Sequence, residues 1–191
     1  MDLMVTPLTR EKTFLVYPEL ARPISFHQQA FNDGYLTGDE SEEERKEDLE
    51  YLASICDDEV LDGVGVAKGE TLLQLTVPVI ESFSCSLADC FISLAKLNGW
   101  NSFVFIPQLR TAWFPSKNDY PPVLKCRAEL KKLLPDIGFA GGLLINKEEL
   151  HEMLEICFWV RRCCPEVAPI WFTAEGAQWS ASMCQYGVLH V

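Results

Sequence analysis

The sequence has few positive charges and few histidines, and it contains no long hydrophobic run. Its 191 residues include 16 Lys and Arg against 28 Asp and Glu, so the net charge is −12, and there are three histidines. Sequence-independent binding to DNA or RNA requires clustered Lys and Arg, so this composition argues against a nucleic-acid partner. No segment approaches the roughly 18 uninterrupted apolar residues of a membrane helix, and no membrane contact is expected.

Several motifs that carry known chemistry are also missing. The chain has no Walker A sequence, no G-x-S-x-G elbow and no C-x-x-C pair. "GVGVAKG" at 63–69 departs from the dinucleotide pattern because its third glycine comes one residue late. "HEMLE" at 151–155 has Glu155 where a zinc protease has its second histidine, so its polar residues are interpreted as a solvated helix face. We therefore expect no cofactor and no metal.

The start of the chain indicates a compartment. "MDLMVTPLTREK" lacks the basic start, apolar stretch and cleavage site of a signal peptide, which predicts a cytoplasmic protein. Eight cysteines lie mostly inside apolar helical or strand patterns. In a reducing compartment they are expected to pack as small hydrophobic residues and not as disulfides.

Hydrophobic periodicity predicts one globular domain over 1–191 with an α+β fold, in which about four helices pack on a mixed or mainly antiparallel sheet. The expected helices are 42–56, 83–97, 122–134 and 147–164. The expected strands are 12–17, 102–106 and a hairpin of 60–66 with 70–77, and 137–145 is a strand or a glycine-rich turn. A turn-rich segment is expected around "NDG" at 32–34, and C-terminal strands are expected around a turn near Glu175 and Gly176.

The negative charge is concentrated in one short stretch. Residues 39–59 hold eleven acids and two bases, which is nine of the twelve net negative charges. Ser41 and Glu44 match the Ser-x-x-Glu capping box, so the stretch is predicted to be an amphipathic helix with its acids outward. Such a surface is either a solvated face or a site that accelerates encounter with a basic partner. The residues predicted to contact this partner are Asp39, Glu40, Glu43, Glu44, Glu47, Asp48 and Glu50.

Three aromatic residues lie in a long irregular loop at 107–122. Trp113, Phe114 and Tyr120 occur there among prolines. Aromatic side chains on a loop can anchor a protein interface, so we add these three to the predicted contact site. The alternative is that the rings fold back and cover the core.

Two segments, "DESEEERKEDLE" at 39–50 and "IWFTAEGAQWS" at 170–180, give the chain a profile that resembles bacterial immunity proteins, which neutralise a cognate toxin. This resemblance implies a non-catalytic protein that occludes a basic toxin domain with carboxylates. The leading hypothesis from the sequence is therefore a cytosolic interaction protein with a basic protein partner.

An enzyme with a cysteine or carboxylate active site is the alternative. Cys85 or Cys90 on the helix at 83–97 could act as a nucleophile, and the start of a helix favours the thiolate form of Cys85. A base such as His27 would have to come from a distant segment. A pocket holding Cys85 with a histidine within hydrogen-bond reach would favour this alternative. A third hypothesis, compatible with both, is a homo-oligomer in which the aromatic loop or the C-terminal strand forms the contact.

Overall fold

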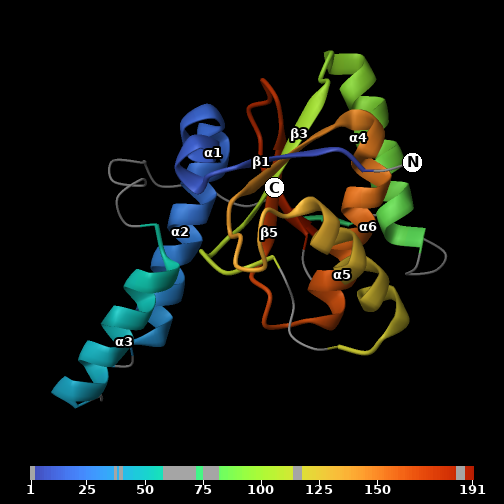
Figure 1. Ribbon diagram of the computed structural model, residues 1–191. Coiled ribbons are helices and arrows are strands. Elements are labelled where there is room, and N and C mark those ends of the chain that lie inside the picture. The colour runs from blue at the N-terminus through green and yellow to red at the C-terminus, as the bar shows by residue number, and fades with distance from the viewer. Residues whose placement is uncertain are drawn as a thin grey trace.

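An antiparallel sheet with helices on both faces organises the chain (Figure 1). The computed structural model describes residues 3–36, 38, 41–57, 72–74, 82–113, 118–183 and 188–191. Its seven strands follow the order β1-β4-β3-β5-β6-β7-β2, and every neighbouring pair is antiparallel. They are β1 (Val5–Leu8), β2 (Leu72–Gln74), β3 (Ser102–Pro107), β4 (Gly142–Asn146), β5 (Ile170–Ala174), β6 (Ala181–Met183) and β7 (Val188–His190). The α+β prediction is confirmed.

Six α-helices lie within the described residues, two more than the sequence predicted. They are α1 (Arg10–Val16), α2 (Pro18–Tyr35), α3 (Glu42–Ile55), α4 (Phe83–Asn98), α5 (Pro121–Leu133) and α6 (Leu150–Cys163), with the short 3₁₀ turn η2 (Lys147–Glu149) before α6. The four predicted helices correspond to α3, α4, α5 and η2 with α6. Gly99 ends α4 in a left-handed conformation, which glycine adopts without strain.

The central strand β3 shows how the sheet separates two cores. Phe103 and Phe105 pack with α4, α5 and α6 on one face, whereas Val104 and Ile106 pack with α1 and α2 on the other. All four side chains are fully buried, because successive residues of a strand point to opposite faces and both faces are covered. A strand buried on both sides is continuously hydrophobic, as "FVFI" is.

The prediction of a strand at 12–17 is wrong, because these residues belong to α1 and the turn after it. Thr9 caps the helix by accepting a hydrogen bond from the backbone N–H of Lys12. Phe14 is buried while its neighbours Leu15 and Val16 are 82% and 53% exposed, which suits one turn of a helix against the sheet. The aromatic and β-branched residues of "KTFLVY" suggested a strand, and tertiary packing overrode that preference.

The turn predicted at 32–34 is also wrong. These residues continue α2, and the backbone N–H of Leu36 still donates to the carbonyl of Asn32. At 137–145, the second half of the segment forms β4. Gly142 begins that strand, and a Cβ there would collide with the Thr13 side chain, so this glycine allows α1 to lie close against the sheet.

Most of the predicted hairpin of 60–66 with 70–77 lies outside the described residues. Within them, β2 pairs with β7, in the register Leu72 opposite His190. Near the C-terminus, Gly176 has a positive φ in the turn after β5, as predicted for the segment around Glu175 and Gly176.

Helix α3 lies beside the C-terminal part of α2 and extends away from the sheet, at the lower left of Figure 1, and the rings of Tyr35 in α2 and Tyr51 in α3 have centroids 5.7 Å apart. We call α3 the acidic arm. Within the described part of the chain, no helix combines the length and apolar character needed to cross a membrane.

Candidate active site

Helix α4 presents a thiol and a carboxylate on its outer face. Cys85 lies in the first turn of α4 and is exposed. Phe83 and Leu87 are buried on the opposite face and fix the helix against the core. Asp89 follows Cys85 by four residues, and side chains with this spacing are neighbours on a helix surface.

A histidine reaches this face from α6, which packs beside α4. The start of α6 is fixed by a reciprocal capping box between Asn146 and Glu149. Leu150 and Leu154 are fully buried, so His151 is held at the boundary with α4, and 38% of its side chain remains exposed. The imidazole therefore lies between the two helices.

Cys85, His151 and Asp89 form a connected line of side chains. The Sγ of Cys85 is 3.7 Å from Nδ1 of His151, and Nε2 of His151 is 3.2 Å from Oδ1 of Asp89. In the tautomer that carries its proton on Nε2, the ring directs this N–H toward Asp89, whose carboxylate can accept it, and the lone pair of Nδ1 faces the thiol. This is the order required of a nucleophile, a base and a group that orients the base.

A hollow of about 210 Å³ opens beside the thiol. Its walls are Ser84, Cys85, His151, Glu152, Glu155 and Trp159. Tyr120 packs edge-on against Trp159, with ring centroids 5.7 Å apart. A small group of a ligand can therefore approach Cys85 between an aromatic wall and two carboxylates.

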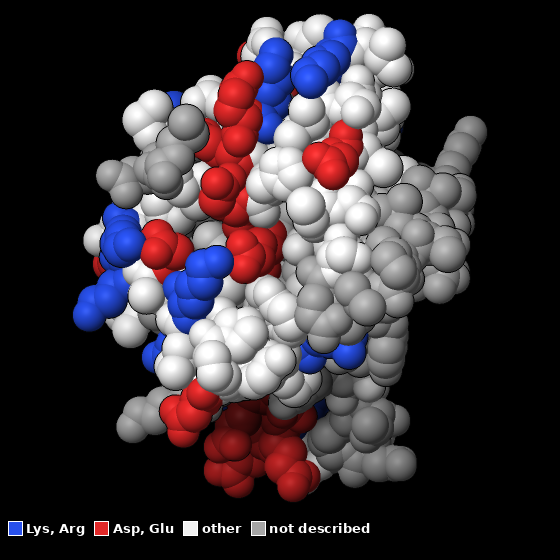
Figure 2. Space-filling model, turned by 90° about the vertical axis from the view of Figure 1, so that its right-hand side faces the viewer, with Lys and Arg blue, Asp and Glu red and all other residues white. Residues whose placement is uncertain are grey.

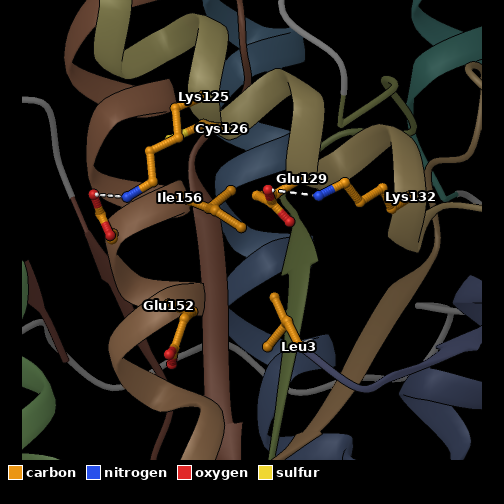
Figure 3. Close-up of a pocket in the computed structure, with 8 residues that line it drawn as sticks. Leu3, Lys125, Cys126, Glu129, Lys132, Glu152 and Ile156 are labelled. Carbon is orange, nitrogen blue, oxygen red and sulfur yellow. Dashed lines mark hydrogen bonds and ion pairs between the residues drawn. The ribbon is translucent and has the colours of Figure 1, made fainter. Parts of the chain in front are cut away.

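A second hollow of about 240 Å³ shares Glu152 and Glu155 with the first. It is drawn in Figure 3, where α5 and α6 enclose it and Leu3 and Ile156 face each other across its apolar part. Lys125 of α5 contacts Glu155 at 3.0 Å, and this hydrogen bond and charge raise the pKa of Lys125. The two carboxylates thus stand between two hollows on one side of the molecule.

Figure 2 shows the side of the molecule that carries α4, α5 and α6. Acidic side chains gather in the middle of this face, with basic side chains on both sides of them. The acids at the Cys85 site are Asp89, Glu152 and Glu155, of which Asp89 is 70% and Glu155 39% exposed. Carboxylates gathered in this way favour the approach of a cation.

Burial separates Cys56, Cys126, Cys157 and Cys164 from the exposed thiols of Cys85 and Cys90. Desolvation raises the pKa of the Cys126 thiol to about 12, and the same cause raises the pKa of Cys157. Burial also raises the pKa of Cys163 and Cys164. The prediction that cysteines pack as small hydrophobic residues fits Cys126, Cys157 and Cys164, which are buried, but Cys85 and Cys90 are exposed.

The sequence indicated Cys85 as a candidate nucleophile, but it suggested His27 and not His151 as the base. His27 lies 5.3 Å from Trp171, on the sheet face covered by α1 and α2, whereas α4 covers the other face. The interpretation of "HEMLE" as a purely solvated face is wrong for His151, which contacts Cys85 and Asp89. Periodicity places His151 on the outside of α6, but it cannot show that α4 lies against that side.

The acidic arm carries most of the predicted partner-binding residues. Glu43, Glu44, Glu47 and Glu50 are exposed on α3, and Asp48 is half-buried. Asp39, Glu40 and Phe114 lie outside the described residues. Both halves of the capping box are present: Ser41 accepts from the backbone N–H of Glu44, whose carboxylate accepts from the backbone N–H of Ser41.

Trp113 and Tyr120 have different surroundings. Trp113 is completely buried and its Nε1 donates to the carbonyl of Gly141 at 2.8 Å, so its assignment to a surface contact is wrong. For this residue the alternative holds, since the ring folds back into the core. Tyr120 is 48% exposed, but it lies near the Cys85 hollow and comes from the segment before α5, not from α3.

A buried polar network joins the arm to the body of the protein. Arg10 pairs with Asp57 through two nitrogens, with a closest distance of 2.6 Å, and also donates to the backbone carbonyls of Pro107 and Ala140. Gln28 donates to the Asp57 carboxylate at 2.9 Å and accepts from the backbone N–H of Asp57 at 3.0 Å. Asp57, which was counted among the acids of the surface stretch, is therefore a buried structural residue.

The last turn of α3 is held by a further residue. Arg110 donates through its side chain to the carbonyl of Ser54 and through its backbone N–H to that of Ile55. Cations at the carboxyl end of a helix satisfy its free carbonyls and oppose its dipole. The arm is thus anchored at its C-terminal end. Neither Arg10 nor Gln28 was singled out from the sequence, because nothing local marks a residue whose partners are distant in the chain.

The described residues contain no cluster of three or more side chains able to hold a metal ion. No known protein family, no curated protein and no solved structure matches this chain.

Proposed function

We propose that this protein is a cysteine-dependent acyl hydrolase or acyl transferase, in which Cys85 is the nucleophile. The observation that carries the proposal is the line from the Cys85 thiol through His151 to Asp89 beside a hollow. It meets the condition that would favour the enzyme alternative over the interaction protein. His151 would be the general base, and Asp89 would orient its ring.

The reaction follows from these roles. The Sγ of Cys85 attacks the carbonyl carbon of an ester, thioester or amide, while Nδ1 of His151 accepts the thiol proton. The leaving group takes this proton as its bond to carbon breaks, and a thioester remains on Cys85. Water, deprotonated by His151, then attacks the thioester, which releases the acid and restores the thiol. In a transferase, an amine or alcohol would take the place of water.

The position of Cys85 in α4 supports this chemistry. Negative charge develops on the sulfur and on the carbonyl oxygen during attack. The first turn of a helix is the positive end of its dipole, and its backbone N–H groups have no acceptor within the helix. Donors of this kind stabilise an oxyanion when they are fixed in place before the reaction.

Hydrolysis of small activated esters tests the proposal. We expect Cys85→Ser and His151→Ala each to lose about a hundredfold or more in kcat/KM, the usual contribution of a nucleophile or general base. Cys90→Ser is the matched control, because Cys90 is the other exposed thiol of the same helix. Mass spectrometry should find the acyl group on Cys85 after a rapid acid quench.

Equal hydrolysis by Cys85→Ser and Cys90→Ser would contradict the assignment. Asp89→Asn should lower kcat with little effect on KM, because it changes only the orientation and charge stabilisation of His151. An unchanged kcat in that variant would remove Asp89 from the mechanism while leaving the pair of Cys85 and His151.

A second candidate function is the one expected from the sequence, a toxin-neutralising immunity protein of bacterial type. The observation that favours it is the acidic arm, which is anchored at one end and keeps its exposed carboxylates away from the body. Fixed negative charge would accelerate encounter with a basic protein such as a toxin domain.

The triple variant Glu43→Gln, Glu47→Gln and Glu50→Gln tests this second function, since it leaves the capping residue Glu44 intact. Tagged protein and variant would be used for affinity capture from the native lysate at low salt. A basic partner that the protein retains and the variant loses, with an affinity that falls as salt rises, is the expected result. Partner affinity and salt dependence that are unchanged in the variant would reduce the arm to a solvated helix.

Both functions suit a cytoplasmic protein, in which thiols stay reduced. Neither requires nucleic acid. Self-association remains compatible with both, and a mass in solution that rises with concentration would reveal it.

A further inference from the structure

We infer that the Cys85 site selects substrates that carry a positive charge next to the reacting carbonyl group. This inference rests on the proposed acyl chemistry and specifies the substrate class. The carboxylates of Glu152 and Glu155 and the ring of Trp159 form the selecting surface, since all three line the hollow that contains Cys85 and His151.

Glu152 is the more available of the two carboxylates. It is exposed at the hollow, and within the described part of the chain it has no ion-pair partner. Glu155 contacts Lys125 at 3.0 Å but keeps 39% of its side chain exposed. A cationic substrate would gain from both carboxylates, whereas an anionic substrate would be repelled by them and by Asp89.

The aromatic wall suits the same class of ligand. Trp159 lines the hollow, and Tyr120 supports its ring. The face of a Trp ring attracts ammonium and guanidinium groups, and the ring also packs against the aliphatic part of a Lys or Arg side chain. Carboxylates beside an aromatic ring therefore accommodate an alkylammonium or guanidinium group.

The size of the hollows limits the cation to about one side chain. The hollow at Cys85 has about 210 Å³, which is less than the roughly 300 Å³ at the lower end of common ligand pockets. The second hollow, shown in Figure 3, begins at the same two carboxylates and contains the apolar side chains Leu3 and Ile156. A substrate with a basic side chain could place an adjoining apolar group there.

Methanethiosulfonate reagents of opposite charge test the selecting surface without requiring catalysis. The thiolate attacks the sulfenyl sulfur of the reagent, a protein disulfide forms and methanesulfinate leaves. Rates would be measured with the aminoethyl and sulfonatoethyl reagents on Cys90→Ser, which keeps Cys85, and on Cys85→Ser, which keeps Cys90. The rate ratio of cationic to anionic reagent at Cys90 corrects for the intrinsic reactivity of the two reagents.

We expect this ratio to be about tenfold or more higher at Cys85 than at Cys90, since two nearby carboxylates act with opposite sign on the two reagents. The double variant Glu152→Gln and Glu155→Gln should bring the ratio at Cys85 down to that at Cys90. The control, Glu43→Gln with Glu47→Gln, changes the net charge equally but on the acidic arm, and it should leave the ratio unchanged. Equal ratios at the two thiols, or a fall that is as large in the control, would overturn the inference.

Ester hydrolysis separates this inference from the proposed function. With blocked lysine and norleucine esters as probes, the Glu152→Gln and Glu155→Gln variant should raise KM several-fold for the lysine ester alone. If both esters are hydrolysed with equal kcat/KM and Cys85→Ser loses this activity, the proposed enzyme function is supported and the cation preference is contradicted. If Cys85 prefers the cationic reagent but the protein hydrolyses neither ester, the cation site is supported and the acyl chemistry is contradicted.

Discussion

At the scale of single residues, the buried ion pair of Arg10 with Asp57 is stable only if both of its charges are compensated. Both side chains are removed from water, and each charge is compensated by the other and by hydrogen bonds from Gln28 and to backbone carbonyls. Removal of one partner of such a pair leaves an uncompensated buried charge, which typically costs 3–5 kcal/mol. The network therefore fixes the chain after α3 against the start of α1.

Asp57→Ala should accordingly lower the free energy of unfolding by about 3 kcal/mol, because it leaves the Arg10 guanidinium buried without its counter-ion. Urea denaturation followed by circular dichroism measures this loss. The double variant Arg10→Met with Asp57→Ala should be more stable than the sum of the single changes predicts. Glu50→Ala breaks the exposed contact with Lys46 at 3.9 Å and serves as the control, with an expected change below about 0.5 kcal/mol. A similar loss of stability in Asp57→Ala and Glu50→Ala would show that the buried pair contributes no more to the free energy of unfolding than the exposed one.

The same scale shows what could be predicted of the candidate site. Cys85 was identifiable, since the stripe Phe83, Leu87 and Phe91 defines the inner face of α4 and places the thiol outside it. Its partner His151 could not be identified from the sequence, because the approach of α6 to α4 depends on how both helices pack on the sheet. Sequence periodicity gives the orientation of each helix to the core but not the identity of its neighbour.

At the scale of elements, α3 illustrates a helix whose local signals were sufficient. The capping box of Ser41 and Glu44 predicted its start, and both hydrogen bonds are present. Leu49, Leu52 and Cys56 follow the spacing of an inner apolar stripe, but only Leu52 and Cys56 are buried, and Leu49 is 47% exposed. A helix packed only at its C-terminal end depends on its cap for order at the other end.

Ser41→Ala should therefore loosen the first turns of α3 without unfolding the protein. Loss of an N-cap costs about 1 kcal/mol, and here the cost falls on a segment that is not packed against the body. Hydrogen exchange should become faster at the amides of residues 44–48 while the amides of β3 keep their protection. Ser54→Ala, which removes only an exposed bond to the carbonyl of Tyr51, should leave both sets unchanged. Uniform acceleration in both sets would indicate global destabilisation.

At the scale of the whole molecule, burial of thiols links stability to pH. The Cys126 thiol has a pKa of about 12 in the folded protein, compared with 9.0 in the unfolded chain, because the folded state excludes water from the thiol. Between these pH values the unfolded chain releases the proton and the folded chain keeps it. The stabilising contribution is complete below pH 9 and is lost as the pH rises toward 12.

The free energy of unfolding should consequently fall more steeply above pH 9 in the unmodified protein than in Cys126→Ala. The difference should be about 1 kcal/mol at pH 10, measured relative to pH 7 by urea titration at each pH. Groups that titrate independently of Cys126 contribute equally to both proteins and cancel. Cys90→Ala, which removes an exposed thiol, should follow the unmodified protein. Parallel curves for Cys126→Ala and the unmodified protein would contradict the link.

The fold class was predictable at this scale, but the strand order was not. Four helices and strand β3 follow from periodicity and from glycine or proline at their ends, whereas for the segment that holds β4 the sequence left a strand and a glycine-rich turn open. The order depends on pairings such as Val5 with Ile145, between segments far apart in the sequence. No local pattern encodes such a pairing. It results from the burial of both sheet faces by helices that come from opposite ends of the chain.

Of the described strands, β1 and β2 stand at the two ends of the sheet, and both come from the first half of the chain. Their partners β4 and β7 are made later, so neither strand can pair while the nascent chain is short. At about 5–20 residues per second, Val5 leaves the ribosome several seconds or more before Ile145 exists. During synthesis β1 therefore has no strand partner until β4 has been made, and Pro7 in β1 limits pairing with other chains because it cannot donate a strand hydrogen bond.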